Sequence, residues 1–221
     1  MNIVIGVYPQ QAGGKFLFNC LGLSNQAYLQ DINLVRQQRS GQLTPQNKLN
    51  LLIDRLNSVE DTWNDLYLGC RQLFGYGSNL NPGQFDPRQF HPEISQLASG
   101  DKLFFVVAHT IKTFKILINI WPNAKIIYFD KCEKFIRWRC NRIPSPLSFN
   151  STECNYITQY NPIIWNSDTY LDRENFFVNI KWVYNQLGLD DFNLTLIEPF
   201  YDKYINILGK IKNDNNNIKC Q

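Results

Sequence analysis

The sequence lacks a long apolar run. Its longest candidate segment, residues 103–107, has the length of a strand and falls far short of the roughly 20 residues that a membrane-spanning helix needs. The first residues also lack the basic start of a secretory signal, because they lead straight into a glycine-bearing turn. We therefore expect a protein with no membrane span that works in the cytoplasm.

The chain also lacks a strong charge of either sign. Its 22 lysines and arginines stand against 19 aspartates and glutamates, which gives a formal net charge of +3. Proteins that bind nucleic acid in bulk usually have a strongly basic face, so we expect no nucleic-acid partner. A few local basic groups are still sufficient to hold a small anion.

Metal-ligand patterns are missing as well. None of the six cysteines forms a Cys-x-x-Cys pair, and the chain has only two histidines, His91 and His109. A structural zinc site usually needs such a cluster, so we expect no metal site and reduced thiols, as in a cytosolic protein.

The length of the chain and its hydrophobic content indicate one folded domain. With 221 residues, of which 44% are hydrophobic, the chain can bury a sizeable core. No internal repeat and no second domain is evident. We expect a single α/β domain over residues 1–212 and a polar, frayed tail over residues 213–221.

Apolar residues alternate between strand-like and helix-like spacing along the chain. Strands are predicted at 2–8, 102–109, 124–129 and 193–197, and helices at 16–23, 44–62, 111–120, 131–142, 173–187 and 199–212. Two stretches, 75–92 and 144–170, are predicted to be irregular because of their turn residues. Strands that alternate with helices favour right-handed crossovers, and hence a three-layer P-loop-type fold with a mainly parallel sheet between helices.

The turn between the first strand and the first helix is the most informative feature. Gly13 and Gly14 permit unusual backbone angles, and Lys15 adds a positive charge where the amino end of a helix offers free N–H groups. This pattern predicts a phosphate site; a tight structural turn without ligand is the alternative. A strict phosphate loop would have glycine in place of Pro9 and Ser or Thr in place of Phe16, and that hydroxyl normally holds Mg²⁺.

Four segments resemble the sulfotransferase family in the order in which they occur. The opening strand with Tyr8-Pro9 and its small-residue turn resembles the start of these enzymes. Phe105-Val106-Val107-Ala108-His109-Thr110 lies where they carry a strand ending in a catalytic Lys-Thr-His segment, and Trp121-Pro122-Asn123-Ala124-Lys125-Ile126-Ile127-Tyr128 is similar to their next strand. Near the end, Val183-Tyr184-Asn185-Gln186-Leu187-Gly188-Leu189 resembles their Leu-Gly helix end.

The resemblance implies a donor, PAPS, and a set of residues that would hold it without a metal. The donor would lie on the turn formed by Gln10, Gln11, Ala12, Gly13, Gly14, Lys15 and Phe16. Lys15 would hold the 5′-phosphate and the sulfonate, while Lys131 and Arg139 would hold the 3′-phosphate. Lys131 stands where the family has arginine and Arg139 where it has serine, and Gln10 replaces the usual loop lysine.

His109 is the expected catalytic base. Sulfuryl transfer to a hydroxyl requires a group that takes the acceptor proton, and the ordinary pKa of histidine suits this role. A structural histidine at the end of a strand is the alternative. The resemblance therefore predicts transfer of a sulfuryl group from PAPS to a hydroxyl or amine of a small-molecule or glycan acceptor, chosen by the irregular stretches 75–92 and 144–170.

Two other functions stay open at this point. The run Ile126-Ile127-Tyr128-Phe129-Asp130 imitates a strand that ends in a magnesium-binding aspartate, so a Mg²⁺-dependent P-loop nucleotide phosphotransferase is the rival enzyme. A non-catalytic member of the fold that binds an anion or a partner protein is the other.

Overall fold

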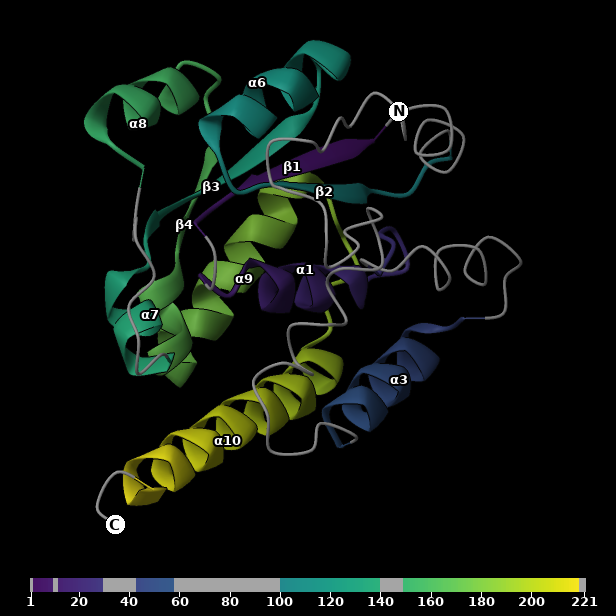
Figure 1. Ribbon diagram of the computed structural model, residues 1–221. Coiled ribbons are helices and arrows are strands. Elements are labelled where there is room, and N and C mark those ends of the chain that lie inside the picture. Colours follow the sequence, from purple (N-terminus) through teal and green to yellow (C-terminus); the bar gives the residue numbers. More distant parts are fainter. Residues whose placement is uncertain (1, 10–11, 30–42, 58–99, 140–148, 219–221) are drawn as a thin grey trace, which may run out of the picture.

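A four-stranded, all-parallel sheet forms the centre of the computed structural model, which describes residues 2–9, 12–29, 43–57, 100–139 and 149–218. The strands are β1 (Ile3–Val7), β2 (Phe104–Ala108), β3 (Lys125–Lys131) and β4 (Ile163–Asn166), in the spatial order β2-β1-β3-β4. Helices flank the sheet, so the predicted α/β fold class is confirmed (Figure 1).

Helices account for most of the remaining described chain. They are α1 (Gly14–Gly22), α3 (Pro45–Asn57), α6 (Ile111–Ile120), α7 (Glu133–Arg139), α8 (Ser151–Thr158), α9 (Arg173–Leu187) and α10 (Leu194–Ile218), with the 3₁₀ turn η3 (Ser167–Leu171) after β4. α1 and α9 lie on one side of the sheet with α3 and α10 beyond them, and α6 and α8 lie on the other side (Figure 1). The sheet is therefore the middle of three layers.

Side-chain caps explain where several helices begin. The Thr44 hydroxyl accepts from the Asn47 N–H at 3.2 Å, and the Thr110 hydroxyl accepts from the Thr113 N–H at 3.1 Å. Such caps satisfy donors that a helix start leaves without a backbone acceptor. At its other end α9 stops at Gly188, which adopts the left-handed conformation that glycine tolerates best.

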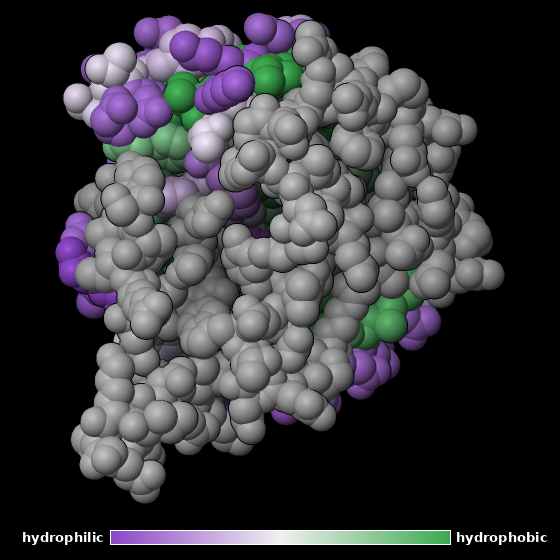
Figure 2. All heavy atoms as spheres, in the orientation of Figure 1, coloured by the Kyte–Doolittle hydropathy of each residue, from purple (hydrophilic) through white to green (hydrophobic). Residues whose placement is uncertain are grey.

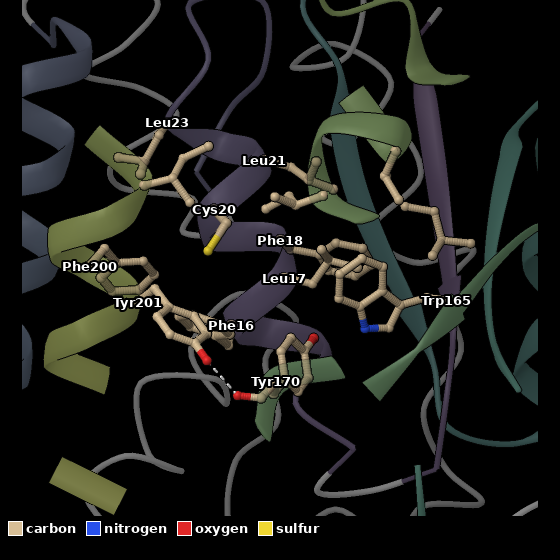
Figure 3. Close-up of a cluster of buried hydrophobic side chains, with 14 of the residues drawn as sticks. Phe16, Leu17, Phe18, Cys20, Leu21, Leu23, Trp165, Tyr170, Phe200 and Tyr201 are labelled. Atoms are coloured by element: carbon tan, nitrogen blue, oxygen red, sulfur yellow. Dashed lines mark hydrogen bonds between the residues drawn. The ribbon is translucent and has the colours of Figure 1, made fainter. Parts of the chain in front are cut away.

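The larger hydrophobic core lies between the sheet and α1, and it is rich in aromatic rings (Figure 3). Phe16 stacks on Tyr204 at 4.1 Å between ring centroids, and Phe176 stacks on Tyr201 at 4.6 Å. The Tyr201 hydroxyl finds a polar partner by donating to the Tyr170 carbonyl oxygen at 2.8 Å. Each such ring adds about 2 kcal/mol of burial free energy, so this layer fixes α1 firmly against α9 and α10.

A buried lysine side chain caps the carboxyl end of α1. Lys48, on α3, is fully buried, and its Nζ donates to the carbonyl oxygens of Gly22, Ser24 and Ala27 at 2.8, 2.5 and 2.9 Å. Burial lowers the pKa of Lys48 to about 7; the Lys102 charge lowers it as well, and Asp191 opposes both. When Lys48 is protonated, three charge-assisted hydrogen bonds join α3 to the end of α1.

Asp191 supports the same turn from the chain segment after α9. Its two carboxylate oxygens accept from the Ser24 hydroxyl at 2.5 Å and from the Asn25 N–H at 2.6 Å. The carboxyl end of α1 is therefore held by groups of both charges, which come from two segments distant in sequence.

Part of the stretch predicted to be irregular is regular. The described part of residues 144–170, from residue 149 onward, contains α8, β4 and nearly all of η3. The start of α8 is a capping box, in which Asn150 Oδ1 accepts from the Glu153 N–H and Glu153 Oε2 accepts from the Asn150 N–H, both at 2.9 Å. The other irregular stretch, 75–92, lies outside the described residues.

The prediction of a strand over residues 193–197 is wrong. Residues 194–197 are the first turn of α10, because the Asn193 side chain accepts from the Thr195 N–H at 3.0 Å and caps the helix. Pro199, which the pattern suggested as the start of the helix, lies inside it. The helix also continues to Ile218, so the predicted tail over 213–221 is helical up to that residue.

The visible described surface over α6 and α8 mixes hydrophilic and hydrophobic side chains (Figure 2). In the part of the chain that the structure describes, no helix combines the length and the apolar character needed to cross a membrane. Cys20 and Cys154 are free thiols.

Candidate functional site

The candidate site lies at the carboxyl edge of the sheet. β1 continues into the glycine turn on the α1 side, whereas β2 continues into α6 on the opposite side, and the chain then crosses to β3 on the other flank of β1. Strand connections thus diverge beside β1, and open parallel sheets bind ligands in the crevice outside such a switch point. The turn around Gly13 and the residue His109 both belong to this edge.

The glycine turn leads directly into α1. Gly13 is the N-cap residue with φ +79°, and its carbonyl oxygen accepts from the Leu17 N–H at 3.2 Å. Within the described residues, no acceptor receives the N–H groups of Gly14, Lys15 or Phe16. These three donors and the positive end of the helix dipole form the arrangement that binds phosphate in other α/β proteins.

Hydroxyl groups from η3 fix the carbonyl side of this turn. The Ser167 Oγ donates to the Ala12 carbonyl oxygen at 2.7 Å, and the Tyr170 Oη donates to the Gly13 carbonyl oxygen at 3.0 Å. Both side chains are fully buried. The turn therefore has its acceptors bound inside the protein before any ligand arrives, which lowers the cost of organising its donors.

Aromatic rings occupy the space beside both glycines. A methyl group on Gly13 would lie 2.5 Å from Tyr170 Cε2 and 2.9 Å from Phe135 Cε1, and one on Gly14 would overlap the Tyr8 ring. Glycine is thus required at these positions by the protein's own packing. The two glycines by themselves are consequently weaker support for a phosphate cradle than the sequence suggested.

The other predicted turn residues differ in what they can contribute. Lys15 is half-buried in the first turn of α1. Phe16 belongs to the aromatic core, so its side chain is committed there and its backbone N–H remains as the group that can meet a ligand. Ala12 is buried beside Ser167. Gln10 and Gln11 lie outside the described residues.

His109 lies just beyond the end of β2 and is bound to the residue that follows β1. Its Nδ1 is 3.0 Å from the Tyr8 carbonyl oxygen, and its ring meets the Tyr8 ring edge-on at 4.9 Å between centroids. Burial lowers the pKa of His109, and the hydrogen bond to Tyr8 opposes this. Because a carbonyl oxygen can only accept, Nδ1 carries the proton, and in the neutral ring Nε2 is left as a base.

The two predicted contacts for the 3′-phosphate lie at the ends of their elements. Lys131 is the last residue of β3, and Arg139 is the last residue of α7. Between them, Arg137 forms an ion pair with Glu133 at 2.6 Å on the exposed side of α7.

The amino end of α7 already binds an anionic group of the protein. Asp168 Oδ1, from η3, accepts from the Phe135 N–H at 2.8 Å. Burial, Asp168, Asp130 and Glu133 together raise the pKa of the Cys132 thiol to about 12. The end of β3 thus has a partly acidic environment.

The role of η3 was not predicted from the sequence. Its Ser167 and Tyr170 contact the glycine turn, and its Asp168 contacts the start of α7. The capping-box pattern Asn150-Ser-Thr-Glu153 and the apolar run Ile163-Ile164-Trp165 were signals for α8 and β4. No local pattern marks Ser167 or Tyr170, because their partners are more than 150 residues away in the chain.

Comparison with known proteins adds no family to this picture. No family model, no curated protein and no solved structure matches the chain. The geometry of the site itself is therefore the basis for proposing a function.

Proposed function

We propose that the protein is a sulfotransferase-like enzyme that binds PAPS at the amino end of α1. The observation that carries this proposal is the pairing of two features at one edge of the sheet. The turn has its carbonyl oxygens of Ala12 and Gly13 held by buried hydroxyls, with N–H donors at the start of α1, and His109 lies just beyond the end of the adjacent strand β2.

The reaction assigns one step to each feature. The oxygen or nitrogen of the acceptor attacks the sulfur atom in line, the bond between sulfur and the bridging oxygen of PAPS breaks, and PAP leaves with that oxygen. His109 Nε2 takes the acceptor proton. The N–H groups of Gly14, Lys15 and Phe16 and the Lys15 ammonium stabilise the charge on the phosphate and the sulfonate.

Calorimetric titration with PAP, and with ATP in the presence and absence of Mg²⁺, tests the donor. We expect micromolar binding of PAP without metal, and about tenfold weaker binding in Lys15→Ala because one charge-assisted contact is lost. Preferred binding of Mg²⁺-ATP would instead assign the protein to the phosphotransferases. Unchanged PAP affinity in Lys15→Ala would remove Lys15 from the site.

Replacement of His109 tests the base. His109→Ala should lower turnover by a factor of 10² to 10⁴ while it leaves PAP affinity within about twofold of wild type. An acceptor screen with PAPS supplies the assay. Full turnover in His109→Ala would contradict the assignment.

A non-catalytic member of the fold is the second candidate. The rings of Tyr8, Tyr170 and Phe135 beside the two glycines favour it, since a turn needed for packing requires no ligand. Absence of binding by PAP and by ATP would support this candidate against both enzymes.

A further inference from the structure

A hollow lies at the opposite edge of the sheet from the glycine turn. Its volume is about 320 Å³, and its walls come from the amino ends of β1, β2 and β3 and from the carboxyl end of α9. This volume is at the lower end of the range found for small-molecule sites. Nothing in the proposed reaction uses this edge.

Two ammonium groups line the hollow. Lys125 Nζ donates to the Leu187 carbonyl oxygen at 2.6 Å, which places it at the end of α9 and leaves two of its N–H bonds for other acceptors. Lys102 Nζ lies 5.8 Å from the centre of the Tyr28 ring. Within the described part of the chain, no carboxylate forms an ion pair with Lys102 or Lys125.

An amide group is oriented at the same place. Gln26 Oε1 accepts from the Asp190 N–H at 2.9 Å, so the amide of Gln26 is held by its oxygen and its NH₂ group remains as a donor. Asn2 Nδ2 is already used, because it donates to the Asp101 carbonyl oxygen at 2.8 Å. Asp101 also lines the hollow and is the one acidic residue among the described residues that line it.

The charge of Lys102 acts on a buried group of the protein. The Lys102 ammonium contributes to the lowered pKa of buried Lys48, and the Asp191 carboxylate opposes this contribution. An anion next to Lys102 would relieve this repulsion. It would therefore bind more tightly to the folded chain than to the unfolded one and raise stability.

We propose that this hollow is a second ligand site, which binds a small molecule through a phosphate or carboxylate group held by Lys102, Lys125 and Gln26. The site is separate from the turn around Gly13, and it is independent of the function proposed there.

Calorimetric titration with inorganic phosphate and with citrate, at constant ionic strength, tests the site. Saturable binding of either probe is expected, and the stronger of the two identifies the anionic group that the site prefers. Lys102→Gln should weaken this binding about tenfold, because it removes one charge-assisted contact. Lys115→Gln is the matched control: Lys115, on α6, is also a lysine beside a tyrosine ring, at 4.6 Å from Tyr156, and it should change the affinity by less than twofold.

Three results would overturn the proposal. They are no saturable binding of either probe, equal weakening in Lys102→Gln and Lys115→Gln, and loss of binding in Lys15→Ala with full binding in Lys102→Gln. The last result would place the anion at the amino end of α1 instead, which would speak for the proposed function and against this second site.

Discussion

The two ends of α1 differ in how the partial charges of the helix dipole are compensated. At the carboxyl end, Lys48 supplies a buried ammonium group that three carbonyl oxygens share. At the amino end, the first-turn N–H groups meet no acceptor among the described residues, while Ser167 and Tyr170 bind the carbonyl oxygens behind them. The fold thus provides its own counter-charge at one end, whereas the described residues provide none at the other, where the proposed function places the phosphate of the donor.

Replacing the buried charge should produce the largest effect. Lys48→Met leaves three carbonyl oxygens without their donor and should lower the free energy of unfolding by about 3–5 kcal/mol. Denaturant titration measures it. Lys112→Met, at an exposed position of α6, is the control and should change stability by less than about 0.5 kcal/mol. A loss below about 1 kcal/mol in Lys48→Met would contradict the importance given to this contact.

Gly13→Ala should be the next largest. Its φ of +79° disfavours any side chain, and the added methyl would meet the buried rings of Tyr170 and Phe135, so we expect a loss of about 2–4 kcal/mol. Gly209→Ala, in α10, has nothing within 4 Å and should instead stabilise the protein by about 0.5–1 kcal/mol, since alanine favours helix. Equal thermal shifts in the two variants would show that the turn is not constrained.

Removal of one hydroxyl at each end sharpens the comparison further. Tyr170→Phe removes the donor to Gly13, and Tyr184→Phe removes the donor to the Cys20 carbonyl oxygen at 2.8 Å. Each should cost about 1–2 kcal/mol, because a buried carbonyl loses one partner. Tyr170→Phe should also weaken PAP binding, whereas Tyr184→Phe should leave it unchanged. Equal PAP affinity in the two variants would mean that the hydrogen bond from Tyr170 to the turn does not contribute to PAP binding.

A pH series gives an effect comparable to the loss of one hydroxyl. Since the pKa of Lys48 is about 7 in the folded protein and near 10.5 when exposed, the unfolded chain binds more protons above pH 7. Stability should therefore rise with pH from 7 to 8.5, by up to about 1.4 kcal/mol per unit. His109, with its lowered pKa, acts below this window, and Cys132, with a pKa of about 12, opposes the rise only above it. A flat profile would mean that Lys48 keeps an ordinary pKa.

The order of strands and helices was largely predictable, because the sequence patterns that indicate them are local. Thr44-Pro45 indicated the start of α3, and the alternation of apolar strands with helices indicated the parallel sheet. The error at residues 193–197 has a local cause too: three apolar residues looked like a strand, but the Asn193 cap and contacts on the core side decide for helix. The predicted place of His109 beside the turn followed from parallel strands alone.

The rest of the site could not be read from the sequence. Lys48 is one more polar residue on an amphipathic helix until the carbonyl oxygens of residues 22–27 surround it. Ser167 and Tyr170 bind Ala12 and Gly13 across the whole chain. Such contacts depend on how distant segments pack, which residue spacing does not record.

The position of β1 has a consequence for how the chain is made. β1 is central in the sheet, yet Ile3 pairs with Phe104 and Val4 pairs with Lys125. During synthesis about a hundred further residues must follow this apolar strand before either neighbour exists. Since sheet contacts so distant in sequence form slowly, the nascent β1 segment is expected to be a substrate for chaperones until β3 has left the ribosome.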